Sequence, residues 1–380
     1  MAAAQDRFRC SGRAWEPAGP RDRAVAVLMS GGVDSSVAAA VLREAGHDVV
    51  GITMHVPSAL APDGSEAEPR ADSGADAARV ARELDIPHYV VDVRDAFRRL
   101  VIDPFRDAYR RGRTPSPCIG CNTHVKFGVV PRLVREAFGI EQLATGHYAR
   151  IETCDDGPGL FTARHRAKDQ SYFLYGIERT RLAAVRFPLG AWTKDRTRDA
   201  ADRLGLDVSS RAESAELCFA GQADYRAALG PEPDAGPGDV LDLAGQVLGR
   251  HRGISNYTVG QREGLGIALG VPMYVVDIDP ERNTVTLGDR AAAGRRRVRA
   301  AKLNVLAPDA LQRGGRLFGK VRSRLEAAPC TVVELRRDAV TVEFDAPEHG
   351  VTPGQHLVLY APSGRVIAGA EIKPPAGRGD

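Results

Sequence analysis

The chain is short of lysine, of long apolar runs and of net charge. Only six of its 52 basic residues are lysine, and the net charge is +3. Because so small an overall charge attracts nucleic acid weakly, any such partner must bind a local basic patch. No stretch is long and apolar enough to span a membrane, and residues 1–20 lack the apolar core of a signal peptide. We therefore expect a soluble, cytoplasmic protein with no membrane partner.

Cysteine is too scarce for a disulfide framework, because a cytoplasmic chain of 380 residues has only six. Cys118 and Cys121 form a Cys-x-x-Cys pair in a proline-containing loop, 114–122, shortly before a helical pattern with Lys126. Positive charge and helix-end donors lower the pKa of a thiol, so we expect this pair to be reactive. A zinc ribbon needs a second such pair, which the sequence lacks, although His124 leaves a distorted zinc site open.

No lysine follows the glycines of Ser30–Ser36, which excludes the phosphate loop of kinases and GTPases. This Ser-Gly-Gly-Val-Asp-Ser-Ser string lies between an apolar run, 24–29, and a helical pattern, 37–42. Such a strand, turn and helix offer backbone N–H groups, a helix N-terminus and serine hydroxyls to an anion. The string resembles the pyrophosphate loop of the N-type ATP pyrophosphatases, which transfer AMP to a carbonyl oxygen and release pyrophosphate. By this resemblance ATP is bound by Leu28, Met29, Ser30, Gly31, Gly32, Val33, Asp34 and Ser35.

Apolar strands alternate with amphipathic helices from Arg23 to about Leu206, which predicts a parallel sheet covered on both faces. Ligands of such sheets bind beyond the carboxyl ends of the strands, where Ser30–Ser36 lies. Residues 1–20 are predicted to be a disordered leader, and 59–74 a mobile loop beside the site. Strands are expected at 47–55 and 88–93, and helices at 75–84 and 129–138.

Beyond Cys218 short apolar runs replace the helical pattern, so a second domain begins there. Five short strands between Arg316 and Lys373 predict a small barrel, and the arginine-rich stretch 295–309 is interpreted as a junction. The fold class is α/β, with a parallel-sheet nucleotide-binding domain, a small central domain and a C-terminal β-barrel. The expected boundaries are 1–20 for the leader, 21–210 for the catalytic domain, 211–300 for the central domain, 301–373 for the barrel and 374–380 for a tail.

Several strings between residues 21 and 373 are similar to those of the tRNA-specific 2-thiouridylases, which replace the C2 oxygen of the wobble uridine with sulfur. The resemblance implies an adenine nucleotide alpha hydrolase-like first domain, ATP with Mg²⁺, and tRNAs for Lys, Glu and Gln as substrates. It implies that ATP adenylates the C2 oxygen and that sulfur from a cysteine desulfurase then displaces AMP. It also implies a monomer. The strings are Ser30–Ser36, Gly112–Asn122, Ala144–Arg150, Lys168–Leu174 and Tyr257–Gly266.

The same resemblance assigns roles to single residues. Cys218 carries the incoming sulfur as a persulfide, and Cys121 resolves it, which leaves a disulfide between the two. Met54 and Gly146 match positions beside the adenine and the ribose. The base that reacts is flipped out of the anticodon loop to reach the site. The residues implied to contact tRNA are Ser116, Pro117, Cys118, Lys168, Asp169, Gln170, Arg322 and Ser323.

Three positions depart from the usual family pattern. Ser116 stands where asparagine is usual, Ser323 where tyrosine is usual, and Cys118 where many members have an aspartate proposed as acid–base catalyst. A variant with cysteine at this position raises a second mechanism, in which Cys118, Cys121 and Cys218 hold a [4Fe–4S] cluster whose open iron binds sulfide. The residues leave both mechanisms open, and persulfide is preferred. Two competing functions also stay open: an amide-forming synthetase with the same loop, and a tRNA-binding protein whose chemistry has decayed.

Overall fold

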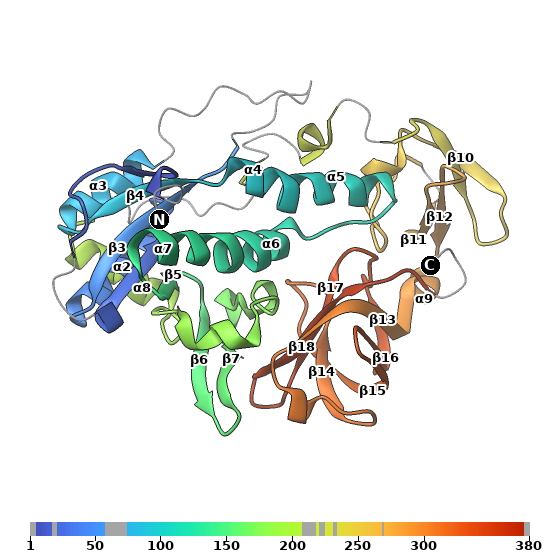
Figure 1. Ribbon diagram of the computed structural model, residues 1–380. Coiled ribbons are helices and arrows are strands. Elements are labelled where there is room, and N and C mark those ends of the chain that lie inside the picture. The colour runs from blue at the N-terminus through green and yellow to red at the C-terminus, as the bar shows by residue number, and fades with distance from the viewer. Residues whose placement is uncertain are drawn as a thin grey trace. The chain divides into compact units, whose positions relative to one another are not determined.

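The computed structural model describes residues 5–16, 21–57, 74–206, 218–219, 225–230, 234–267 and 270–375. The chain divides into two compact units, coloured by position in the sequence in Figure 1. Of the described residues, the first unit has those up to 100 and those from 118 to 219, and the second has 101–117 and those from 225 onward. The segment before Cys118 therefore belongs to the second unit, whereas Cys118 itself belongs to the first.

A six-stranded sheet forms the centre of the first unit. Its strands, in spatial order, are β1 (Phe8–Cys10), β4 (His88–Asp92), β3 (Asp48–His55), β2 (Ala24–Leu28), β5 (Gln142–Thr145) and β8 (Val185–Arg186). All neighbours are parallel except β1 and β4. The chain runs from β2 to β3 and β4 on one side, whereas β5 lies on the other side of β2, so the strand order reverses between β2 and β5. Ligands of such sheets bind at this reversal.

Helices cover the sheet, and the predicted parallel α/β architecture is confirmed. α2 (Val33–Glu44) packs on β2, β3 and β5 and against α8 (Lys194–Arg203), while α3 (Ala75–Glu83) packs on β3 and β4. Three consecutive alanines of α2, 38–40, are buried, and their small side chains let the helix approach the strands closely. A two-stranded hairpin, β6 (Ala149–Cys154) and β7 (Gly157–Thr162), follows β5.

The prediction of a disordered leader over 1–20 is wrong for residues 5–16. Phe8–Cys10 pairs with β4 as the edge strand of the sheet. The rings of Phe8 and Trp15 both pack edge to face on Phe138. Aromatic burial therefore orders a segment whose overall composition is that of a disordered chain.

Cys118 and Cys121 lie in a helix rather than in a loop. α6 (Pro117–Gly120) continues through a π-helical stretch, η3 (Cys121–Val129), into α7 (Val130–Phe138). Proline is favourable in the first helical turn, where its missing N–H has no partner to lose. Pro117 thus starts a helix and does not stiffen a loop.

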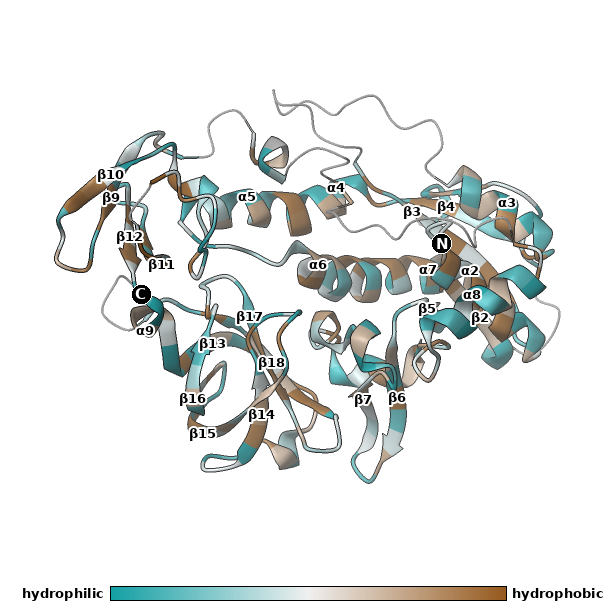
Figure 2. Cartoon of the chain, turned by 180° about the vertical axis from the view of Figure 1, so that it is seen from behind, coloured by the Kyte–Doolittle hydropathy of each residue, from teal (hydrophilic) through white to brown (hydrophobic). Residues whose placement is uncertain are grey.

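The second unit contains a small sheet and a closed barrel. The sheet has the order β10-β9-β12-β11 and the barrel the order β13-β16-β15-β14-β17-β18. Brown and teal segments alternate along the barrel strands in Figure 2, as expected where one face of each strand is buried. The first unit also contains α4 (Arg94–Phe97). The α-helices and β-strands of the second unit are α5 (Asp103–Arg110), β9 (Gly238–Leu241), β10 (Val247–His251), β11 (Tyr274–Asp279), β12 (Thr284–Gly288), α9 (Arg290–Ala293), β13 (Gly294–Val305), β14 (Arg316–Lys320), β15 (Ala328–Arg336), β16 (Ala339–His349), β17 (His356–Tyr360) and β18 (Val366–Ile372).

The barrel begins earlier than predicted. The stretch 295–309, which we expected to be a junction, contains most of β13, and this strand pairs with β16 and β18 to close the barrel. Arg296 and Arg297 are exposed, whereas Val298 and Ala300 are buried. The arginine run hides this alternation in the sequence.

Three predicted segments lie wholly or largely outside the described residues. They are the loop 59–74, of which only Gly74 is described, the start of the central domain at 211–217, and the tail, of which 374–375 are described. Within the described part of the chain, no helix combines the length and apolarity needed to cross a membrane.

Candidate active site

The loop after β2 is a glycine-rich turn that leads into the N-terminus of α2. Gly31 has a positive φ of 76°, and Gly32 is the extended N-cap of α2, so backbone N–H groups lie at the start of the helix. The hydroxyls of Ser35 and Ser36 donate to the Gly32 carbonyl at 3.0 and 2.9 Å. They hold the turn and are not the free phosphate donors that we expect from the sequence. The backbone N–H groups and the helix N-terminus are therefore the groups of this loop with the chemistry to bind an anion.

Two glycines of the site allow close approach of backbone segments. A Cβ added at Gly146, just beyond β5, would lie 2.7 Å from backbone atoms of both Asp34 and Ser35. A Cβ added at Gly31 would lie 2.6 Å from the Cβ of Asp76 in α3. The loop after β2 thus packs tightly against its neighbours at the reversal of strand order. Gly146 therefore lies beside Asp34, and its role near the nucleotide stays a prediction.

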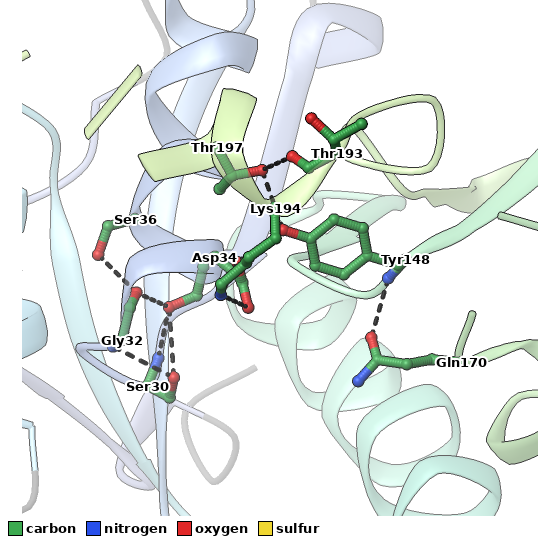
Figure 3. A network of polar contacts seen from close by, with 10 residues as sticks. Ser30, Gly32, Asp34, Ser36, Tyr148, Gln170, Thr193, Lys194 and Thr197 are labelled. Atoms are coloured by element: carbon green, nitrogen blue, oxygen red, sulfur yellow. Dashed lines mark hydrogen bonds and ion pairs between the residues drawn. The ribbon is translucent and has the colours of Figure 1, made fainter. Parts of the chain in front are cut away.

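A buried polar network fixes the Asp34 carboxylate (Figure 3). Nζ of Lys194, the first residue of α8, lies 2.7 and 2.9 Å from the two carboxylate oxygens. The Tyr148 hydroxyl is 2.9 Å from both Asp34 Oδ1 and Thr197 Oγ1. The Gln170 side-chain carbonyl accepts the Tyr148 backbone N–H at 2.9 Å. Sequence reasoning missed Lys194, whose only signal is that it is one of six lysines in an arginine-rich chain.

Three further residues predicted to bind the nucleotide lie at the end of β2, directly after it, and on β3. Leu28 and Met29 are buried, and Met54 is half-buried on β3. His147 follows Gly146, and its Nδ1 is 2.7 Å from the Thr145 hydroxyl. Burial, assisted by the charge of Lys126, holds the pKa of His147 well below its ordinary value, so its imidazole is neutral.

Cys118, Cys121 and Lys126 lie on one helical stretch, α6 and η3, and the pKa of Cys218 responds to the charges of all three. Cys118 and Cys218 are exposed and Cys121 is buried. The Cys121 and Cys118 thiolates raise the pKa of Cys218, and Lys126 lowers the pKa of all three thiols. The charges of these four groups therefore influence one another.

The expectation of low thiol pKa values is wrong. Burial is the largest influence on each of the three thiols and raises the pKa, for Cys218 to about 12. The opposing charge of Lys126 does not overcome it. Cys118 and Cys218 still present surface to solvent, so they are open to reagents while protein surrounds their other sides. The resting site therefore holds protonated thiols.

The thiols do not form a metal centre as they stand. Over the part of the chain that is described, no group of three or more His, Cys, Asp or Glu side chains is placed to hold a metal ion. Neither the distorted zinc site with His124 nor the [4Fe–4S] ligand set of Cys118, Cys121 and Cys218 fits the described arrangement. All six cysteines are free thiols.

The predicted tRNA-contacting segment 168–170 is tied into the first unit. The Asp169 carboxylate accepts from the Ala163 and Ser171 backbone N–H groups and from the Ser171 hydroxyl. Gln170 is held on Tyr148, as described above. Both side chains are therefore used within the fold, and only the half-buried Lys168 has a side chain of the kind that binds phosphate.

In the second unit, the segment before Cys118 is braced by two loops. Gln355 Nε2 donates to the Thr114 carbonyl at 2.9 Å, and the Thr114 hydroxyl donates to that of Thr258 at 3.1 Å. Arg322, predicted to contact tRNA, instead donates to the carbonyls of Gly350 and Val259 at 2.8 and 2.9 Å. Its guanidinium thus joins the barrel to the Tyr257–Gly266 string. Ser116 and Ser323 are half-buried.

A basic groove of about 1250 Å³ lies in the second unit. Eight basic and four acidic side chains line it, so it carries a local excess of positive charge that the whole chain lacks. It contains none of the loop residues or reactive thiols. The basic lining residues are Arg111, Arg113, Arg282, Arg295, Arg297, Arg299, Arg336 and Lys373, and the acidic ones are Asp277, Asp279, Glu281 and Glu334.

Comparison with known families covers both units. Residues 23–222 match the tRNA methyl transferase HUP domain, 229–289 the tRNA methyl transferase PRC-barrel domain, and 295–372 the aminomethyltransferase beta-barrel domain. The match from 295 agrees with the observed start of the barrel strand β13.

Curated relatives match over almost their whole length. The tRNA-specific 2-thiouridylase MnmA of Geobacter metallireducens is 46% identical over 88% of this chain and 93% of its own. Its counterpart in Pelotomaculum thermopropionicum is 44% identical over 92% of this chain and 97% of its own. Among solved structures, the NMN synthetase of Francisella tularensis matches 53% of this chain and 69% of its own, with 15% identity and a TM-score of 0.32, a likeness too weak to assign a fold.

Proposed function

The chain belongs to the family of tRNA-specific 2-thiouridylases, and from this premise we propose that it uses ATP to place sulfur on C2 of the wobble uridine, with Cys218 as sulfur carrier and Cys121 as resolving thiol. The observation that carries the proposal is that the first unit contains both the loop and the thiols. One unit contains a glycine-rich turn with a helix N-terminus at the reversal of strand order, and it also contains Cys118, Cys121 and Cys218.

The uridine C2 oxygen is a poor leaving group, so it must be activated before sulfur can replace it. We propose that it attacks the α-phosphorus of ATP, and that the loop Ser30–Ser36 holds the pyrophosphate that departs. Mg²⁺ would neutralise phosphate charge, and Asp34 is the carboxylate of the loop that fits it. Asp34 is the only carboxylate in this loop, which contains no lysine. The orientation of the Asp34 carboxylate depends on its contacts with Lys194.

Sulfur transfer then uses two thiols. The outer sulfur of a Cys218 persulfide bonds to C2, the Cys121 thiolate attacks the inner sulfur of Cys218, and the sulfur–sulfur bond of the persulfide breaks. AMP leaves with the electrons of the C2–O bond. The product is a Cys121–Cys218 disulfide, which a dithiol reductant must reduce before a cysteine desulfurase chain supplies the next sulfur. Cys118 takes the place of the usual aspartate, and its charge raises the pKa of both Cys121 and Cys218.

The matched family descriptions name a methyl transferase, whereas the curated relatives are named thiouridylases. Methyl transfer needs neither a pyrophosphate loop nor paired thiols, so the residues of the site favour sulfur transfer. As further parts of the proposal, the protein acts as a monomer in the cytoplasm on tRNAs for Lys, Glu and Gln. Phosphates of the tRNA bind the basic groove of the second unit.

The test is to incubate the protein with ATP, tRNA and a persulfide donor, and to measure AMP, pyrophosphate and 2-thiouridine. The proposal predicts all three products in equal amounts, and thiouridine is lost in Cys121→Ser and Cys218→Ser. If tRNA binds without formation of AMP and pyrophosphate, the chain is instead a binding protein whose chemistry has decayed. AMP formation that needs neither thiol would point to another adenylating enzyme.

A further inference from the structure

A lysine at the start of a helix needs an explanation. Lys194 is the first residue of α8, after the N-cap Thr193, whose side chain accepts the Arg196 N–H. The N-terminal end of a helix is the positive end of its dipole, which disfavours a cation there. The Lys194 side chain is also only 8% exposed. Two costs therefore act against this lysine, and only a specific partner offsets them.

That partner lies in the pyrophosphate loop. Nζ of Lys194 contacts both carboxylate oxygens of Asp34, 160 residues earlier in the chain. The Tyr148 hydroxyl donates to one of the same oxygens. These contacts with Lys194 and Tyr148 fix the orientation of the carboxylate. A third of the Asp34 side chain nevertheless remains exposed. The exposed part is what a ligand of the loop can reach.

The helix that carries Lys194 packs on the helix that carries Asp34. α8 contacts α2, and Thr197, one turn along α8, is 2.9 Å from the Tyr148 hydroxyl. Lys194 is therefore attached to a rigid element rather than to a loop. A phosphate loop of the kinase type places its lysine directly after the glycines; here a cation reaches the loop from a distant helix and binds the loop's own acid.

Resting on the proposed function, we propose that Lys194 is a positioning residue that holds the Asp34 carboxylate in the orientation in which the loop binds ATP with its metal ion. Lys194 acts through Asp34 and does not itself contact the phosphates. Its removal weakens nucleotide binding because the carboxylate then becomes free to rotate, or to turn against the incoming phosphates.

The experiment compares ATP–Mg²⁺ affinity, measured by calorimetry, in four proteins: wild type, Lys194→Met, Asp34→Asn and the double variant. We expect Lys194→Met to weaken ATP binding by about tenfold or more, on the scale of one charge-assisted contact, and to raise the Mg²⁺ concentration needed. The four proteins form a double-mutant cycle. If Lys194 acts through Asp34, Lys194→Met should have no further effect on ATP affinity in the Asp34→Asn background. An undiminished effect of Lys194→Met in the Asp34→Asn background would show direct phosphate contact and overturn the proposal, as would unchanged affinity in the single variant.

Controls separate folding from positioning. Lys302→Met removes a lysine that is ion-paired with Glu371 in the barrel, and it should leave ATP affinity unchanged. If Lys194→Met does not fold, Tyr148→Phe keeps the ring and removes the other donor to Asp34 Oδ1. It should weaken ATP binding in the same direction by a smaller factor, and no change would count against positioning of this carboxylate. Wild-type protein that fails to bind ATP would refute the proposed function itself, independently of Lys194.

Discussion

At the scale of single residues, Lys126 influences the pKa of the proposed resolving thiol. Burial raises the pKa of Cys121 above its ordinary value, and the Lys126 ammonium limits that rise. Because the thiolate is the attacking form, sulfur transfer should accelerate as pH rises from about 7 to 9. Lys126→Met should move this pH dependence to higher pH and slow transfer about three- to tenfold at a given pH.

Lys126→Arg keeps the charge and should retain most of the wild-type rate. The measurement is the single-turnover rate of thiouridine formation from protein loaded with persulfide, followed at several pH values. Identical pH profiles for wild type and Lys126→Met would show that the ammonium does not influence the attacking thiol.

A second residue, His88, links the edge of the sheet to the loop. Thr53 donates its hydroxyl proton to the Met29 carbonyl at 2.8 Å, so His88 Nε2, also 2.8 Å from that hydroxyl, must carry a proton. His88 Nδ1 then accepts from Ser11. This arrangement requires a neutral ring, and burial lowers the pKa of His88 from 6.5 to about 4.

Because the folded-state pKa of His88 lies below the unfolded one, its contribution to stability is present above pH 6.5 and is lost as pH falls toward 4. The loss is on the order of 3 kcal/mol. Urea unfolding at several pH values should therefore show a smaller acid destabilisation in His88→Gln than in wild type. If the free energy of unfolding depends on pH equally in the two proteins, His88 does not contribute to the acid destabilisation.

At the scale of elements, the sequence predicts most of the first unit and misjudges its ends. Alternation of strands and helices identifies β2, β3, β4, α2, α3 and α7, because the strands are short apolar runs and the helices are segments with helical spacing of apolar residues. It fails at Pro117, since a proline before a cysteine pair is equally typical of a loop and of a helix start. It fails again at β13, where outward-facing arginines conceal the buried positions Val298 and Ala300.

Contacts between distant elements cannot be predicted from one sequence at all. The Lys194 ion pair needs α8 and α2 to pack together, and no local pattern indicates this. Gly146 could be predicted from the sequence, because it lies in the Ala144–Arg150 string that resembles the family. The string does not explain why this position requires glycine. The structure supplies the reason, namely that β5 and the start of α2 approach too closely for a side chain.

Gly146→Ala should therefore weaken ATP binding and lower stability by about 1–3 kcal/mol, because the added methyl group meets backbone atoms that cannot rotate away. Gly12→Ala is the matched control, since a Cβ there meets no atom within 4 Å. Calorimetric titration with ATP and thermal unfolding measure the two effects. Normal ATP affinity in Gly146→Ala would mean that this approach does not shape the nucleotide site.

At the scale of the whole molecule, the proposed catalytic residues and the basic groove lie in different units. The loop and the thiols lie in the first unit, whereas the basic groove lies wholly in the second. Arg111 and Arg336 are exposed in this groove, and neither forms an ion pair with another described residue. Their charges are therefore available to phosphates.

Replacing Arg111 and Arg336 by alanine should weaken tRNA binding and reduce the slope of log affinity against log salt by about one for each lost phosphate contact. ATP affinity should not change. Arg313→Ala, at an exposed barrel position outside the groove, is the control. Filter binding of tRNA across a salt series measures the effect, and an unchanged slope would place tRNA elsewhere.

In the proposed mechanism, sulfur reaches the uridine from a Cys218 persulfide. The most direct measurement uses iron-free protein, loaded once with persulfide and mixed with ATP and tRNA, with 2-thiouridine quantified by mass spectrometry alongside iron and labile sulfide. The account predicts thiouridine in an amount equal to the loaded Cys218 persulfide, and a Cys121–Cys218 disulfide in the spent protein. Thiouridine formed only by protein with four irons per chain, and lost in Cys118→Ala together with the iron, would contradict it.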